Sequence, residues 1–102
     1  MVSPREAIDA AERRGGPDHP DTSQSLNNLA SLRVGQGDHA RAEPLYDRAL
    51  AIRERALGPD HPLVAEILEN LATLYRKTDR DALADEAEAR ATRIRAAARA
   101  PR

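Results

Sequence analysis

The chain repeats itself with a period of 42 residues. The pentapeptide Gly-Pro-Asp-His-Pro occurs at residues 16–20 and again at 58–62, and 58 − 16 = 42. When the sequence is shifted by this period, 16 of the 38 positions from Gly16 to Arg53 are identical. A fixed period between about 20 and 50 residues is typical of one supersecondary unit stacked on copies of itself. Such stacks form extended surfaces, so the repeat favours a binding module over an enzyme.

The composition favours helices. Two of the 102 residues are Tyr and none is Phe or Trp, so Leu, Ile, Val and Ala must build the core. Ala is the best helix former, whereas β-branched and aromatic residues favour strands. We therefore expect an all-α protein, and the length fits a single domain, 1–102.

Charge and composition argue against several classes of partner. The 16 basic and 17 acidic residues are interspersed and give a net charge of −1, so neither nucleic acid nor a membrane surface is expected to bind. The sequence has no Cys, no apolar run typical of a signal peptide and no window of about 18 apolar residues. We expect a soluble cytoplasmic protein. One Lys against fifteen Arg, with abundant Ala, indicates a GC-rich bacterial genome.

Apolar periodicity and turn residues predict five helices, at 4–14, 20–34, 39–57, 62–77 and 80–100. Asp38 is the expected N-cap of the third helix and Gly58 its stop. Pro44 lies inside that helix, near its first turn, and predicts a slight bend rather than a break. Connections of about 3 to 6 residues make consecutive helices antiparallel neighbours, so the repeating unit is a helical hairpin.

The predicted helices carry apolar residues at i, i+3 and i+4 spacing. On the second helix these are Leu26, Leu29, Ala30 and Leu32; on the third they are Ala42, Leu45, Tyr46, Ala49, Leu50 and Ile52. The fourth helix is the most apolar of the five. The last has Ala at most core positions and only Leu83 and Ile94 as large apolar residues, which is typical of a solvated end.

These residues resemble the tetratricopeptide repeat, in the 42-residue form of kinesin light chains and many bacterial multi-repeat proteins. The family's pattern on the first helix of a hairpin is met by Leu68, Leu71, Ala72 and Tyr75, and by Leu26, Leu29 and Ala30 with Arg33 out of pattern. Its pattern on the second helix is met by Ala42, Tyr46 and Ala49, and by Ala84 and Ala91 with Glu88 out of pattern. The resemblance implies a right-handed α-α superhelix, a solenoid of antiparallel helical hairpins.

The resemblance also implies how the chain divides. Residues 1–15 correspond to half a repeat, 16–57 to the first full repeat and 58–100 to the second, which has a polar C-terminal cap. Glu88 in place of a packing Tyr suits the outer side of a last helix, so we expect a true end or a capping element there. Only half a repeat precedes the first full one, so the N-terminus resembles a truncated repeat. Because stability needs roughly three repeats, we expect either a fragment of a longer array or a self-associating chain.

Binding in the family occurs on the concave face formed by the first helix of each hairpin. The groove positions correspond here to Gln24, Asn27, Asn28, Ser31 and Val34, and in the second repeat to Glu66, Glu69, Asn70, Thr73 and Arg76. Asn28 and Asn70 are the strongest candidates, because an exposed amide both donates and accepts hydrogen bonds and can pair with a peptide backbone. The alternative is that these Asn residues cap or brace neighbouring hairpins, since Asn has a low helix propensity.

The resemblance implies a protein-protein interaction module, a scaffold or adaptor that binds a peptide or protein and needs no cofactor. The groove lacks the cluster of Lys and Arg with which chaperone-adaptor members of the family clamp a C-terminal carboxylate, so a ligand of mixed or basic charge fits at least as well as an acidic one. The alternative is a structural element that self-associates through its repeat ends, or a fragment of a larger multi-repeat signalling protein.

Other patterns are weaker. His19 and His61, with Asp18 and Asp60, are metal-ligand types, but the two pairs lie a full repeat apart without a third ligand, so we expect these residues to form turns and caps. No nucleophile motif accompanies the Ser and His residues, and we expect no enzymatic activity. The Arg residues between Arg90 and Arg102 are expected to pair with the Asp and Glu one turn earlier.

Overall fold

The protein is all-α, as predicted. The structure is a computed structural model in which residues 4, 5, 8 and 19–100 are described. Its helices are α2 (Pro20–Gly35), α3 (His39–Leu57), α4 (Pro62–Lys77) and α5 (Asp81–Arg99), and the described residues contain no strand. The bounds of these four helices are confirmed to within one residue at each end. Most of the predicted first helix, 4–14, lies outside the described residues.

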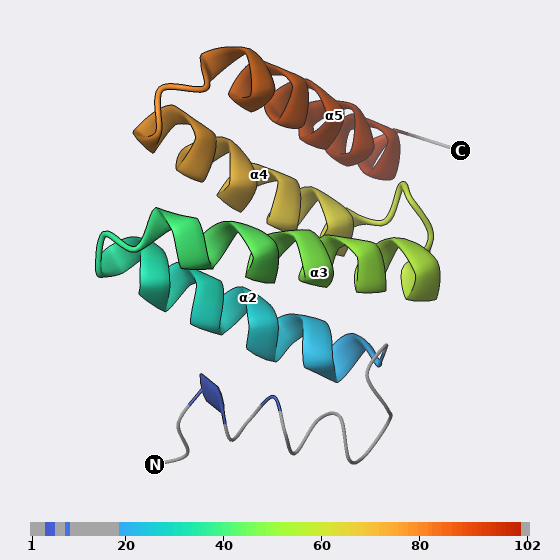
Figure 1. Cartoon of the computed structure of the whole chain (residues 1–102). Helices are drawn as coiled ribbons and strands as arrows, with labels where there is room; N and C mark the ends of the chain where they lie inside the picture. The colour runs from blue at the N-terminus through green and yellow to red at the C-terminus, as the bar shows by residue number, and fades with distance from the viewer. Residues whose placement is uncertain (1–3, 6–7, 9–18, 101–102) are drawn as a thin grey trace.

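Consecutive helices run antiparallel and form two hairpins, α2 with α3 and α4 with α5 (Figure 1). The second hairpin stacks on the first through α4, which contacts both α3 and α2. The helices that begin the two hairpins, α2 and α4, therefore lie on one side of the stack. The helices that end them, α3 and α5, lie on the other.

The repeated pentapeptide begins a helix in the same way at both sites. His19 and His61 are N-caps, and the Nδ1 of each accepts a hydrogen bond from the backbone N–H two residues later, at 3.1 Å in both cases. The following Pro occupies the first turn, where its missing N–H costs no hydrogen bond. The expectation that these His residues cap is confirmed.

The third helix begins and ends as predicted. Asp38 is its N-cap and accepts a hydrogen bond from the backbone N–H of Arg41 at 3.2 Å. Gly58 ends it with φ 94°, a left-handed conformation that favours glycine. The helix continues through Pro44, which is exposed.

Apolar side chains form two clusters, and α4 contributes to both. In the first, Ile67, Leu71 and Leu74 of α4 pack on the first hairpin, whose buried members are Leu26, Ala30, Ala42, Tyr46, Ala49 and Ile52. Ile8 belongs to the same cluster. The second lies within the second hairpin and includes Val64, Leu68, Ala72, Ala84, Ala91 and Ile94. Because α4 is covered on two sides, it needs the most apolar sequence of the helices.

One predicted core position is wrong. Leu32 was expected on the apolar side of its helix, but 45% of it is exposed. Its counterpart one repeat later, Leu74, is completely buried because that side of α4 packs on the first hairpin. The same side of α2 faces away from the second hairpin.

Candidate functional site

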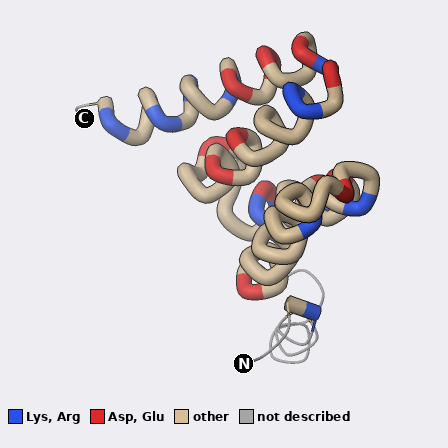
Figure 2. The backbone as a smooth tube through the Cα atoms, turned by 90° about the vertical axis from the view of Figure 1, so that its left-hand side faces the viewer, with Lys and Arg blue, Asp and Glu red and all other residues tan. Residues whose placement is uncertain are grey.

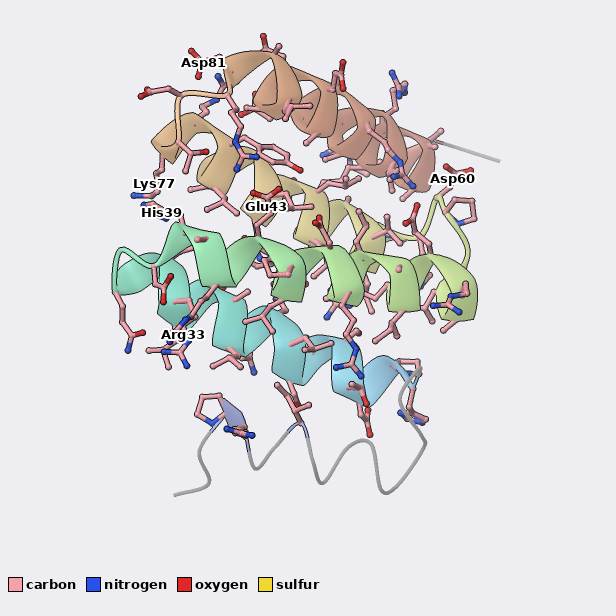
Figure 3. The ribbon with its side chains drawn as sticks, in the orientation of Figure 1. Arg33, His39, Glu43, Asp60, Lys77 and Asp81 are labelled. Carbon is pink, nitrogen blue, oxygen red and sulfur yellow. The ribbon has the colours of Figure 1, made fainter. Side chains whose placement is uncertain are left out.

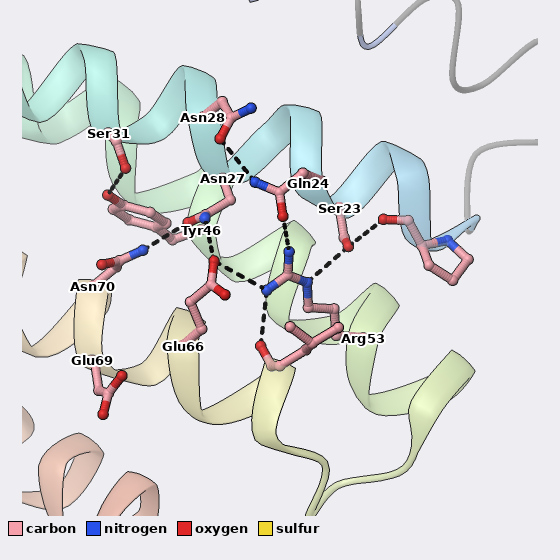
Figure 4. Close-up of polar contacts among 12 residues, drawn as sticks. Ser23, Gln24, Asn27, Asn28, Ser31, Tyr46, Arg53, Glu66, Glu69 and Asn70 are labelled. Carbon is pink, nitrogen blue, oxygen red and sulfur yellow. Dashed lines mark hydrogen bonds and ion pairs between the residues drawn. The ribbon is translucent and has the colours of Figure 1, made fainter.

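Polar side chains from α2 and α4 gather on one face of the molecule (Figure 4). We call it the α2–α4 face, and its residues are the predicted groove positions Gln24, Asn27, Asn28, Ser31, Glu66, Glu69, Asn70, Thr73 and Arg76. Intervals of three, four and seven residues place side chains on the same side of a helix, so the period of the helix explains this grouping. Val34, which the resemblance also assigned to the groove, is half-buried against the first apolar cluster.

Three of these side chains join the two hairpins. Asn27 is 5% exposed, and its amide donates a hydrogen bond to Glu66 Oε1 at 3.0 Å. The amide of Asn70 donates in turn to Asn27 Oδ1 at 2.9 Å. Both bonds cross from α2 to α4. Asn70 therefore braces neighbouring hairpins, which is the alternative to peptide binding considered above for the Asn residues.

Asn28 has a different environment. It is exposed, and its Oδ1 accepts a hydrogen bond from Gln24 Nε2 at 2.9 Å. The oxygen of the same Gln24 amide, Oε1, accepts a hydrogen bond from Arg53 at 2.8 Å. No described residue accepts a hydrogen bond from the Asn28 amide. This arrangement orients Asn28 and leaves its donors free.

Arg53 is a member of the site that the sequence analysis missed. It is 2% exposed and extends from α3 between the first turns of α2 and α4. Its guanidinium donates to Ser23 Oγ at 2.9 Å and to the backbone carbonyl of Leu63 at 2.9 Å, in addition to its bond to Gln24. Glu66 Oε1 lies 3.6 Å from Arg53 Nη1. The sequence did contain an indication that this position matters, since the pair Ile52-Arg53 recurs one repeat later as Ile94-Arg95.

Arg76 of the face, and Arg95 beside it on α5, are paired with carboxylates of the second hairpin. Arg95 binds Glu69 through two hydrogen bonds of 2.8 and 2.7 Å, and these bonds lower the pKa of Glu69. Arg76 donates to Glu88 at 3.0 and 2.9 Å and to Asp85 at 2.8 Å. With Arg53 buried, the face presents no unpaired cation among its described residues.

The two remaining groove positions make hydrogen bonds within their own hairpin. Ser31 Oγ and Tyr46 Oη lie 2.9 Å apart and share a hydrogen bond, which fixes the buried Tyr ring beneath the face. Thr73 Oγ1 donates to the backbone carbonyl of Glu69 in its own helix at 3.2 Å. Neither side chain links the hairpins.

Positive and negative charges separate along α5, with its acidic residues near the start and its Arg residues near the end (Figure 2). The prediction that these Arg residues pair with acids one turn earlier is wrong for Arg90 and Arg95. Arg90 binds Glu54 of α3 at 2.7 Å, and Arg95 binds Glu69 of α4. Arg95 has no acidic residue one turn earlier, where Ala91 and Thr92 stand, and its side chain reaches the neighbouring helix instead.

The described residues contain no group of three or more His, Cys, Asp or Glu side chains that could hold a metal ion. His19 and His61 use Nδ1 to cap helices instead. Among the same residues, no helix combines the length and the apolar character needed to cross a membrane.

Comparisons with known proteins agree with the repeat. The tetratricopeptide repeat family profile matches residues 5–54 and 24–97. The crystal structure of BtubC (BKLC) from P. vanneervenii aligns with 97% of the chain at 30% sequence identity, with a TM-score of 0.87. The chain spans 40% of the length of that protein chain. No curated protein matches the sequence.

The family is one of non-catalytic repeat scaffolds, and tetratricopeptide repeats generally act as protein-interaction modules. The 42-residue period, the stacked antiparallel hairpins and the small buried Ala residues at the helix contacts all agree with that architecture. The chain belongs to the tetratricopeptide repeat family, with repeats like those of kinesin light chains.

Proposed function

We propose that the chain is a non-catalytic scaffold or adaptor that binds a peptide or protein segment along the α2–α4 face. The observation that carries this proposal is the exposed amide of Asn28, oriented by Gln24 with its donors free. Asn70 adds an acceptor to the same face, because its Oδ1 receives no hydrogen bond from a described residue. An extended peptide offers one N–H and one C=O per residue, so these groups suit its backbone.

The hydrogen-bond network supports the proposal because it orders the face before a ligand arrives. Arg53 holds Gln24, Gln24 holds Asn28, and Asn27 holds both Glu66 and Asn70. Ordering a flexible side chain on binding costs roughly 0.5 to 1.5 kcal/mol. Side chains that are already fixed avoid much of this cost.

The charges of the face favour a neutral or basic ligand. Its cations are each engaged by protein acceptors, whereas only one Glu66 oxygen is used in the bond from Asn27. A ligand carboxylate would have to compete with Glu69 for Arg95, or with Asp85 and Glu88 for Arg76. We therefore infer that recognition relies on the peptide backbone and on Lys or Arg side chains.

A selected peptide tests the proposal. Peptides would be selected from a random displayed library on the unmodified chain, and their affinities measured by fluorescence polarisation. We expect Asn28→Ala to weaken binding by about fivefold to tenfold, since its amide contributes roughly 1 kcal/mol or more through two hydrogen bonds. Asn70→Ala is unsuitable alone because it also breaks the bond to Asn27.

Gln36→Ala is the matched control. It also removes a carboxamide, but one that lies in the turn after α2 and accepts a hydrogen bond from Arg33. We expect this variant to bind like the unmodified chain. Equal affinities of the Asn28→Ala and unmodified chains for every selected peptide would contradict the proposal.

The alternative proposal is a structural role, in which repeat ends associate with another copy or with further repeats of a larger protein. The similarity to 40% of a longer solenoid supports it. Light scattering across a tenfold dilution separates the two proposals. A constant monomer mass supports recognition through the α2–α4 face, whereas a concentration-dependent dimer supports assembly.

A further inference from the structure

A second surface lies on the other side of the molecule, between α3 and α5. A groove of about 220 Å³ runs there over α4. Leu68, Leu71 and Tyr75 of α4 line its floor, and Leu83 of α5 lines one wall. We call it the α3–α5 groove. Its lining residues come from α3, α4 and α5, and none of them belongs to the α2–α4 face.

The size of the groove indicates the kind of ligand. Sites for drug-sized molecules usually enclose about 300 to 1,000 Å³. At about 220 Å³, this groove matches one or two side chains of a protein segment better than a whole small molecule.

The apolar residue on the α5 wall of the groove is not a requirement of the repeat. Leu83 is 42% exposed, and the residue one repeat earlier is Arg41, also exposed. The fold therefore accepts a charged residue at this position, and packing alone does not explain the Leu found here.

Two carboxylates flank the apolar floor from opposite walls, Asp47 on α3 and Glu86 on α5. Neither forms a side-chain hydrogen bond or ion pair with a described residue. The nearby cations are already paired. Arg80 binds Glu43, which extends from α3 on the face seen in Figure 3, and Arg90 binds Glu54. The groove therefore carries two carboxylates that form no ion pair with a described residue, although Arg90 also lines it.

The environment of Asp47 agrees with this description. Partial desolvation at the groove wall raises its pKa, and repulsion from Glu43 adds to the effect, while Arg80 opposes it. A cation brought into the groove would favour the ionised form of this carboxylate.

We propose that the α3–α5 groove binds a segment of a partner protein in which an aliphatic side chain is flanked by Lys or Arg. The aliphatic side chain would cover exposed Leu83 and the half-buried Leu50 and Tyr75, and the cations would pair with Asp47 and Glu86. Complementary charge selects the partner, while burial of the aliphatic group supplies affinity. This site does not depend on the α2–α4 face.

A positional peptide library tests this assignment. Each blocked peptide has a central Leu and varied flanking residues, and binding to the unmodified chain is compared with binding to variants. We expect Lys and Arg to be preferred over Asp and Glu by about tenfold, as two partly exposed ion pairs allow. Leu83→Arg should abolish binding of these peptides. The double variant Asp47→Lys with Glu86→Lys should invert the preference.

The controls separate this site from the α2–α4 face. Leu83→Arg should fold normally because Arg41 occupies the equivalent exposed position, and circular dichroism checks this. Asn28→Ala should still bind the basic peptides. The assignment is overturned by the absence of a cation preference, by undiminished binding to folded Leu83→Arg, or by loss of basic-peptide binding in Asn28→Ala. A dimer that Leu83→Arg converts to monomer would also overturn it, by assigning the groove to a second copy.

Discussion

The same residue type serves two purposes at one repeat position. Arg53 is buried and donates to α2 and α4, whereas Arg95, 42 residues later, forms a partly exposed pair with Glu69. Burial makes the first network costly to break, because acceptors that lose a donor inside a protein are not rehydrated.

We therefore expect Arg53→Met to destabilise the protein by about 2 to 4 kcal/mol, since one buried and two partly buried acceptors each lose roughly 1 kcal/mol. Arg95→Met should cost less than about 1 kcal/mol, as is usual for an exposed ion pair. Urea denaturation of both variants measures the difference. Equal losses would show that the burial of Arg53 has no energetic consequence.

The pair between Glu69 and Arg95 predicts a dependence on pH. Hydrogen bonds from Arg95 lower the Glu69 pKa from its ordinary value of 4.5, so folding favours the ionised carboxylate. This contribution is complete above the unfolded-state pKa and is lost as the pH falls through the lower folded-state value. Solvent screening limits it to a few tenths of a kcal/mol.

Accordingly, Glu69→Gln should be slightly less stable than the unmodified chain at pH 7, and the difference should disappear at pH values well below 4.5. Thermal denaturation at low salt across this range measures it. Arg95→Gln should show the same trend, because it removes the same pair. A difference that grows on acidification would contradict this interpretation.

The sequence predicted which side chains share the α2–α4 face, because helical period alone determines that. It did not predict their partners. Asn70 reaches Asn27 only because of the register in which the two hairpins stack. The residues next to Asn27 and Asn70 in the sequence do not specify that register. Arg53 was missed for a related reason, since a charged residue on a helix usually indicates a solvated face.

At the scale of the helix, boundaries were predictable because their signals are local. Pro, Gly and capping residues adjoin most helix ends in the sequence, and the caps act through hydrogen bonds spanning two or three residues. The start of α5 is an exception, since its N-cap Arg80 makes no side-chain cap hydrogen bond. The N-cap of α4 provides a direct test, because His61 receives its hydrogen bond from Leu63 in a partly exposed turn.

His61→Ala should cost about 0.5 to 2 kcal/mol, the usual range for loss of an N-cap. His61→Asn should recover most of this loss, because Asn is among the best N-cap residues. Urea denaturation at neutral pH compares the three proteins. If Asn were no better than Ala, the cap would not be the reason for His at this position.

At the scale of the whole molecule, α4 joins the two hairpins. Its residues Ile67, Leu71 and Leu74 pack on the first hairpin, and Asn70 adds a polar link beside them. The hairpins should therefore unfold together, because separating them would expose this shared core.

Leu71→Ala should destabilise the protein by about 2 to 5 kcal/mol, as expected for a cavity in a core, while retaining one unfolding transition. Leu83→Ala is the matched control and should change stability by less than about 0.5 kcal/mol, because Leu83 is 42% exposed. Calorimetry measures both. Two separate transitions would show that the hairpins are independent units.

The central claim is that the polar groups of the α2–α4 face bind a partner. The most direct test follows the side-chain amide signals of Gln24, Asn28 and Asn70 by NMR while a library-selected peptide is added. We predict that the Asn28 signals shift most, because its donors are free and its position is fixed by Gln24. If no selected peptide perturbs these three amides, the α2–α4 face is not the binding surface.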